Sequence, residues 1–169
     1  MHNALVTAKG EKMSKSLGNG ALVSEVTSSY PPRAVRLYLL APHYRSVIEF
    51  APESLVDATA ALARIDSFVE RAAEVADTPA GDVPAEFTDA MNDDLGTPGA
   101  MAVLYGAVRQ GNSALESGDH EGVRRALAEV RAMLLVLGLA ADDPIWDAQG
   151  SDETALKPVV DGLVRALLT

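Results

Sequence analysis

"PESLVDATAALARIDSFVERAAEVA", residues 52–76, is a stretch in which apolar side chains recur at steps of three and four. Side chains with this spacing share one face of an α-helix, and Pro52 is tolerated in a first helical turn. The stretch therefore predicts one long amphipathic helix, whose apolar face must pack against other elements. The members of that face are Leu55, Ala58, Leu62, Ile65, Val69 and Ala72.

Further helices are expected on the C-terminal side, separated by segments that end helices. Proline, glycine and acidic residues make residues 77–86 a linker, and a short helix begins near Ala85. Thr97 followed by Pro98 indicates a helix start of the cap-then-proline kind, and Ser117 with Gly118 indicates its end. One side of this helix carries Met101, Leu104, Val108, Asn112 and Leu115.

Asp119 can cap the next helix, and Gly138 suits its left-handed end. A last helix is expected after the turn-like residues 141–152. The inner stripes of these two helices are Val123, Leu127, Val130, Leu134 and Leu137, then Leu156, Val160, Leu163 and Leu167. The expected fold class is mainly α, with an antiparallel helical bundle of about four long helices in residues 51–169.

Net charge changes sign between the first 50 residues and the rest. Residues 1–50 hold six basic and three acidic side chains, a net charge of +3, whereas the remaining 119 residues hold 8 and 21, a net charge of -13. This asymmetry suggests a basic head that meets an anion and an acidic body that does not.

Composition also limits the location and the metal chemistry of the chain. The absence of cysteine excludes disulfides and thiolate metal sites, and the three histidines are too far apart in sequence to suggest a metal cluster. We therefore expect no metal bound by this chain. There is no run of eighteen apolar residues and no leader-like segment, so we expect no membrane partner and a cytoplasmic location.

The segment "GEKMSKSLGN", residues 10–19, has no apolar period. Its lysine ammonium groups, serine hydroxyls and glycine N–H groups can all bind phosphate oxygens. Lysines in such a loop can stabilise the charge that grows on oxygens during phosphoryl or adenylyl transfer. The segment is not a Walker A loop, and by composition alone an ordinary surface loop is the more frequent explanation.

Four ordered blocks of the sequence resemble one enzyme family. "KMSKS", residues 12–16, is identical to the signature loop of class I aminoacyl-tRNA synthetases. Together with "MHN" at the start, "PRAVRLYLLAPHYRS" at residues 32–46 and "FTDAMNDDLGTPGAMAVLY" at residues 87–105, it resembles cysteinyl-tRNA synthetase over most of the chain. The resemblance implies a KMSKS loop and stem-contact helical region in residues 1–50, then an anticodon-binding-like, tRNA-binding bundle in residues 51–169.

The resemblance also implies a role for each residue of the loop. Lys15 is expected to contact the ATP phosphates with Lys12 assisting, as the two catalytic lysines, and Ser14 and Ser16 to hold the loop. Met13 is expected to be its apolar anchor. In an intact enzyme of this family the lysines would stabilise the pyrophosphate that leaves when the cysteine carboxylate attacks ATP, which binds with Mg²⁺.

Transfer RNA is the second partner that the resemblance implies. Cysteine would pass from the adenylate to tRNA(Cys), and the family places Arg33, Arg36, His43 and Arg45 near that tRNA. For each of these four residues a role in packing or in an ion pair is an equally open alternative, because the apolar residues around Arg36 predict a packed helix.

The matching region begins in the middle of the family's usual chain. The nucleotide-binding half, with its histidine motif and zinc ligands, is not part of it, so zinc is expected only there and this portion is expected to be inactive alone. Two alternatives stay open. The chain could be a non-catalytic tRNA-binding or regulatory module, or part of the related mycothiol-pathway ligase, which passes cysteine to an amino sugar.

Overall fold

The computed structural model describes residues 4–8, 10–13, 20 and 22–146. Within them the chain is mainly helical, as predicted, and the expected last helix with Leu156 to Leu167 lies outside the described residues. The elements in chain order are β1 (Val6–Ala8), β2 (Glu11–Lys12), α1 (Val23–Ser29), α2 (Pro32–Leu40), β3 (Ile48–Glu49), α3 (Pro52–Ala76), α4 (Ala85–Asn92), α5 (Thr97–Ser117), α6 (His120–Leu137) and the 3-10 turn η2 (Pro144–Trp146).

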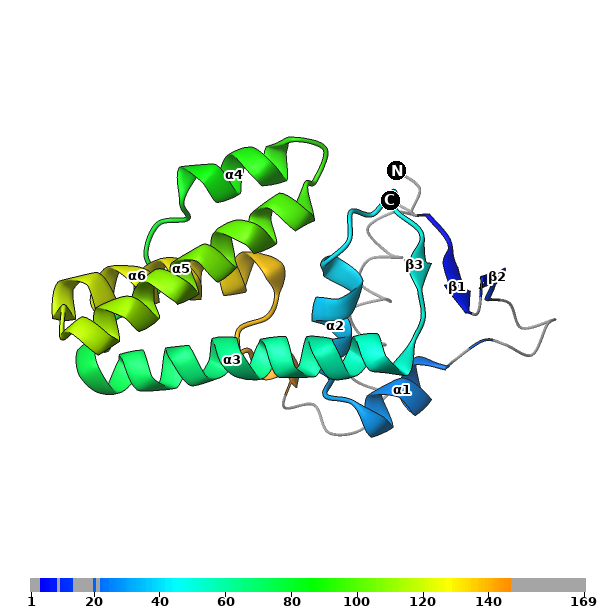
Figure 1. The fold of residues 1–169 in the computed structure, drawn as a ribbon, viewed down its shortest axis with the longest axis horizontal. Coiled ribbons are helices and arrows are strands. Elements are labelled where there is room, and N and C mark those ends of the chain that lie inside the picture. Colours follow the sequence, from blue (N-terminus) through cyan, green and yellow to red (C-terminus); the bar gives the residue numbers. More distant parts are fainter. Residues whose placement is uncertain (1–3, 9, 14–19, 21, 147–169) are drawn as a thin grey trace, which may run out of the picture.

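The helix α3 runs along the length of the molecule, and most of the other helices lie against it (Figure 1). Its 25 residues span about 37 Å at 1.5 Å per residue. α2 packs on the part of α3 near the small sheet, whereas α5 and α6 pack on the part farther along, and α4 covers α5. The expected domain boundary between residues 50 and 51 falls just before α3. The division of the chain into a domain of residues 1–50 and a domain of residues 51–169 stays a prediction.

The predicted stripes form the core. Every member of the α6 stripe is buried, and on α3 the stripe is buried except for Val69, which is half-buried. Phe68, fully buried, fills the space between α3 and α5, where a Cβ at Gly111 would lie 2.3 Å from the phenyl ring. Two members of the α5 stripe are only half-buried: Leu115, and Asn112, whose amide nitrogen donates to the Val108 carbonyl at 3.0 Å.

The helix ends agree with the sequence in three places and differ in a fourth. Gly118 ends α5 with a φ of 71°, as expected. Asp119 caps α6 by accepting from the Gly122 N–H at 3.0 Å, and Gly138 ends that helix with a φ of 62°. Thr97, however, is not a cap: Gly96 is the N-cap of α5, and the Thr97 hydroxyl donates to the Pro42 carbonyl at 3.1 Å. The chain passes so close to the preceding helix here that a Cβ on residue 96 would lie 2.6 Å from the Ala90 carbonyl oxygen.

Two arginines of α2 attach it to the bundle. The Arg33 guanidinium donates to both carboxylate oxygens of Asp66 on α3, at 2.9 and 2.8 Å, and to the Leu139 carbonyl at 2.6 Å. Arg36 donates from Nε to the Leu137 carbonyl at 2.7 Å. The last carbonyls of a helix have no partner within it, and positive charge is favourable at that end. The α2 arginines therefore complete the C-terminal end of α6.

Residues 1–50 contain a small sheet that the sequence analysis did not expect. Its strand order is β2-β1-β3, with β1 antiparallel to β2 and parallel to β3. The strands have only two or three residues, and backbone bonds such as Ile48 N–H to Leu5 O at 3.1 Å extend the pairing beyond them. No helix among the described residues is long and apolar enough to cross a membrane.

We expect Leu134→Ala to lower the free energy of unfolding by about 2 to 5 kcal/mol, because it removes buried methyl groups and leaves a cavity. Leu134 is 3% exposed, whereas its neighbour Leu135 is 57% exposed. Leu135→Ala is therefore the matched control and should change stability by less than about 0.5 kcal/mol. Urea unfolding followed by circular dichroism measures both. Equal losses in the two variants would contradict the placement of this α6 stripe in the core.

Candidate functional site

The β1–β2 hairpin carries the start of the KMSKS segment. Gly10 forms its turn with a φ of 77°, a left-handed conformation that glycine adopts without strain. Glu49 on β3 fixes this turn, since its carboxylate accepts from the Gly10 N–H at 3.1 Å and from the Thr7 hydroxyl. Tyr38 on α2 donates its hydroxyl to the Glu49 carbonyl at 2.8 Å. The hairpin is thus held to α2 through one glutamate.

Lys12 and Met13 are the described members of the KMSKS segment, and Ser14, Lys15 and Ser16 lie outside the described residues. Lys12 is exposed on β2, and Met13 is half-buried directly after it. Met13 lines a mostly apolar pocket of about 360 Å³ between the hairpin, α1 and α2. The other lining residues include Val26, Val35 and Phe50.

The four side chains predicted to contact tRNA fall into two groups. Arg33 and Arg36 lie in the joint between α2 and the end of α6, where the Arg33 side chain is only 14% exposed. His43 and Arg45 lie in the loop between α2 and β3 and contact Asp94 in the turn between α4 and α5. All four have partners within the protein, and their contact with RNA stays a prediction.

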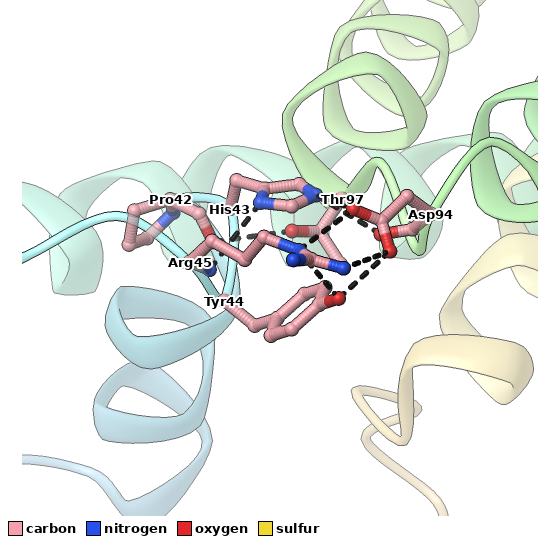
Figure 2. Close-up of polar contacts among 6 residues, drawn as sticks. All are labelled: Pro42, His43, Tyr44, Arg45, Asp94 and Thr97. Atoms are coloured by element: carbon pink, nitrogen blue, oxygen red, sulfur yellow. Dashed lines mark hydrogen bonds and ion pairs between the residues drawn. The ribbon is translucent and has the colours of Figure 1, made fainter. Parts of the chain in front are cut away.

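Figure 2 shows the second group converging on Asp94. The Tyr44 hydroxyl donates to Oδ1 of Asp94 at 2.7 Å, and the Arg45 guanidinium lies 2.9 Å from Oδ2. Arg45 also donates to the Tyr44 hydroxyl at 2.8 Å, and its Cζ stands 5.1 Å from the centre of the Tyr44 ring. His43 donates from Nε2 to the Asp94 carbonyl at 2.9 Å, because a carbonyl can only accept.

The Asp94 carboxylate stabilises a strained turn. Asp94 and Leu95 have φ values of 52° and 55°, which are uncommon for residues other than glycine. The hydrogen bond from Tyr44, and then that from Arg45, hold the pKa of Asp94 below its usual value, against the opposing effect of burial. The same hydrogen bond to Asp94 raises the pKa of Tyr44. The cluster fastens the α2–β3 loop to the α4–α5 turn.

The sequence analysis missed the acidic partners in these contacts. Each of these acidic residues lies 33 to 51 positions away in sequence from the residues that it holds: Asp66 from Arg33, Asp94 from Arg45 and His43, and Glu49 from Gly10 in the hairpin turn. Nothing in the local sequence pairs them with their partners. Among the residues that the structure describes, no group of three or more histidine, aspartate or glutamate side chains could hold a metal ion.

Comparison with protein families matches two adjacent parts of the chain. The model for the "tRNA synthetases class I (C) catalytic domain" matches residues 1–60, and that for the "DALR domain" matches residues 86–141. The first match contains the hairpin, α1, α2 and β3, and the second contains α5, α6 and all of α4 except its first residue. The chain therefore belongs to the class I tRNA synthetases.

Curated relatives narrow this assignment. The chain is 53% identical to the cysteine–tRNA ligase of Cutibacterium acnes, over 99% of this chain and 36% of the relative. It is also 53% identical to that of Streptomyces coelicolor, over 99% of this chain and 28% of the relative. The chain is thus a member of the cysteine–tRNA ligase family, as its sequence motifs predicted, and spans about a third of the length of these relatives.

A solved structure with a similar fold is LeuRS (agnB2) of Agrobacterium radiobacter K84, in a ternary complex with tRNA and LeuAMS. The TM-score is 0.59 at 19% sequence identity, and the alignment covers 89% of this chain and 22% of that protein. At this identity the likeness concerns the fold alone.

We expect Asp94→Asn to lower the melting temperature at neutral pH, because the amide loses the charge that Tyr44 and Arg45 stabilise. A carboxylate whose pKa is depressed on folding contributes stability above its unfolded pKa, near 3.8, and loses it as the pH falls through the folded value. The difference in melting temperature between wild type and variant should therefore shrink below about pH 4.

Asp93→Asn is the matched control, since Asp93 is the exposed neighbouring residue and its side chain has no hydrogen bond or ion pair among the described residues. It should leave the melting temperature nearly unchanged at every pH. Calorimetry from neutral to acidic pH measures all three proteins. A constant offset between wild type and Asp94→Asn down to the lowest pH would contradict the role of the charge.

Proposed function

We propose that this chain is the C-terminal portion of an enzyme that activates cysteine with ATP and transfers it to tRNA(Cys). In this proposal the chain supplies the KMSKS loop for ATP and a helical bundle for tRNA. It does not catalyse the reaction alone, because it spans only about a third of its relatives. The observation that carries the proposal is 53% identity to cysteine–tRNA ligases over 99% of the chain.

The proposed role of the loop follows from the chemistry of its side chains. The cysteine carboxylate attacks the α-phosphorus of ATP, and the bond to the pyrophosphate breaks as negative charge grows on the leaving oxygens. Lys15, with Lys12 assisting, stabilises that charge, and Ser14 and Ser16 hold the loop in position. The Mg²⁺ that accompanies ATP belongs to the substrate. The hairpin held by Glu49 supports this proposal, because it fixes the strand from which the loop departs.

Met13 fits the role of an apolar anchor. It is half-buried and lines the apolar pocket beside α1 and α2. The Met13 side chain can therefore fasten one side of the loop by an apolar contact, which leaves the lysines for the proposed contact with phosphate. Lys12, the residue before Met13, is exposed on β2. Its exposed position supports the proposed contact with a phosphate of ATP.

The proposed tRNA role draws on the bundle and the head. The LeuRS with a similar fold was solved with tRNA, and this chain's own relatives are named as tRNA ligases. We propose that Arg33, Arg36, His43 and Arg45 lie near the tRNA; the side chain of Arg45 is 66% exposed, whereas those of His43 and Arg33 are 26% and 14% exposed. We propose the cytoplasm as the location. Zinc, which the resemblance places in the remaining part of the enzyme, has no role in this chain.

The experiment that tests the function is a chimera. The matching 36% of the Cutibacterium acnes ligase is replaced by this chain, and cysteine-dependent ATP–pyrophosphate exchange and tRNA(Cys) charging are measured. We expect both activities. Lys15→Ala should lower the exchange rate about 100-fold, as loss of one donor to a developing oxyanion does elsewhere, and Lys12→Ala should lower it less. The melting temperature should not change.

Lys9→Ala is the control, because Lys9 is a nearby lysine outside the five-residue motif. It should retain most of the exchange activity. A chimera that folds but neither exchanges nor charges would favour a non-catalytic module. Charging of an amino sugar instead of tRNA would favour the mycothiol-pathway alternative.

A further inference from the structure

A groove of about 650 Å³ lies between α3 and α5. Three arginines line it, Arg64 and Arg71 from α3 and Arg109 from α5, together with Tyr105 and Asn112. The rest of its lining is small or apolar and consists of Ala61, Ala63, Ile65, Ser67 and Val108. No acidic side chain of the described chain lines this groove.

The positive charge in this groove is not neutralised within the described residues. Arg71 donates from Nη2 to Oδ1 of Asn112 at 2.6 Å and from Nε to the Ser67 carbonyl at 3.2 Å, and both acceptors are neutral. Arg64 and Arg109 make no hydrogen bond or ion pair to any residue that the structure describes. Each of these guanidinium groups therefore keeps donors available for an anion.

Four of the six other arginines in the described chain are paired with a carboxylate, the exceptions being Arg36 and Arg125. Each of the four lies within 2.9 Å of a carboxylate oxygen: Arg33 with Asp66, Arg45 with Asp94, Arg124 with Glu121 and Arg131 with Asp77. Acidic side chains outnumber basic ones in residues 51–169, so carboxylates are abundant there. Arg64, Arg71 and Arg109 have no carboxylate partner among the described residues, and all three line one groove. They form a local positive site within a segment, residues 51–169, whose net charge is -13.

The spacing of the arginines suits an extended polyanion. Arg64 and Arg71 are seven residues apart on α3, which is two helical turns or about 10.5 Å along the axis. Phosphates repeat about every 3.4 Å along the axis on one strand of duplex DNA, and on that scale the distance corresponds to roughly three phosphates of a polynucleotide. Arg109 adds a third charge from the opposite wall.

Tyr105 gives the groove a neutral donor. Its side chain is half-buried, and burial raises its pKa while the nearby charge of Arg64 works in the opposite direction. The phenol therefore stays protonated at neutral pH and can donate to a phosphate or ribose oxygen. Asn112 holds Arg71 in place along the groove wall.

We infer that the α3–α5 groove binds the phosphodiester backbone of RNA through Arg64, Arg71 and Arg109. This inference rests on the proposed tRNA role of the bundle, which makes RNA the expected polyanion, and it deepens that proposal by naming the groove and the side chains that would contact the RNA. Phosphate contacts of this kind fix the position of an RNA without reading its sequence.

The test is binding of a fluorescein-labelled tRNA(Cys) transcript to the 169-residue chain, followed by anisotropy from about 50 to 200 mM salt. The triple variant Arg64→Gln, Arg71→Gln and Arg109→Gln should bind about tenfold or more weakly near 0.1 M salt. The slope of log affinity against log salt should fall by about 0.7 to 0.9 for each arginine lost. Inorganic phosphate should compete only weakly, because it spans one arginine at a time.

Arg125→Gln is the matched control, since Arg125 is exposed on α6 and lines a different groove together with Asp119 and Glu129. It should bind tRNA as the wild type does. All variants should melt at the wild-type temperature, because the substituted side chains are exposed.

Two results would overturn the inference. If the triple variant binds tRNA with wild-type affinity and salt slope, the groove is not the site, while the proposed function stands. If the wild-type chain binds no tRNA at low salt, the groove proposal fails, and the proposed function is then judged separately by the charging activity of the chimera.

Discussion

The structure depends on how the backbone carbonyl groups at the C-terminal end of α6 obtain hydrogen-bond partners. A helix leaves its last four carbonyls without partners, and a buried polar group without a hydrogen bond costs about 1 to 3 kcal/mol. Arg33 and Arg36 of α2 donate to the carbonyls around Gly138, and Asp66 on α3 balances the charge of Arg33. This requirement places α2 against both α3 and α6. The small sheet and its hairpin then follow from α2, through Tyr38 and Glu49.

The helices at Pro52–Ala76 and His120–Leu137 could be predicted because local signals specify them: apolar period, a capping aspartate and a terminal glycine. The sheet could not, since strands of two or three residues have no detectable period and the pairing of β1 with β3 joins residues about forty positions apart. The Thr97 cap was wrong because a tertiary approach to Ala90 places glycine at the cap instead.

The candidate site shows the same division between local and long-range information. The KMSKS segment is readable from sequence because its chemistry lies in five consecutive residues. The carboxylates that hold the surrounding loops are distant in sequence, so Asp94 could not be connected to Arg45 in advance. The α3–α5 groove could not be predicted either, because the net charge of residues 51–169 is negative and Arg64 and Arg109 come together only when the helices pack. In the proposed enzyme, α2 and the Asp94 cluster would hold the ATP loop and the RNA-facing bundle in one arrangement.

The most direct test of this account is a double-mutant cycle on Arg33 and Asp66, in which urea unfolding is measured for Arg33→Gln, Asp66→Asn and the double variant. Because this pair is mostly buried and shares two hydrogen bonds, we expect a coupling free energy of about 1 to 3 kcal/mol. Single-variant effects that add to within about 0.5 kcal/mol would show instead that this contact does not fasten α2 to α3.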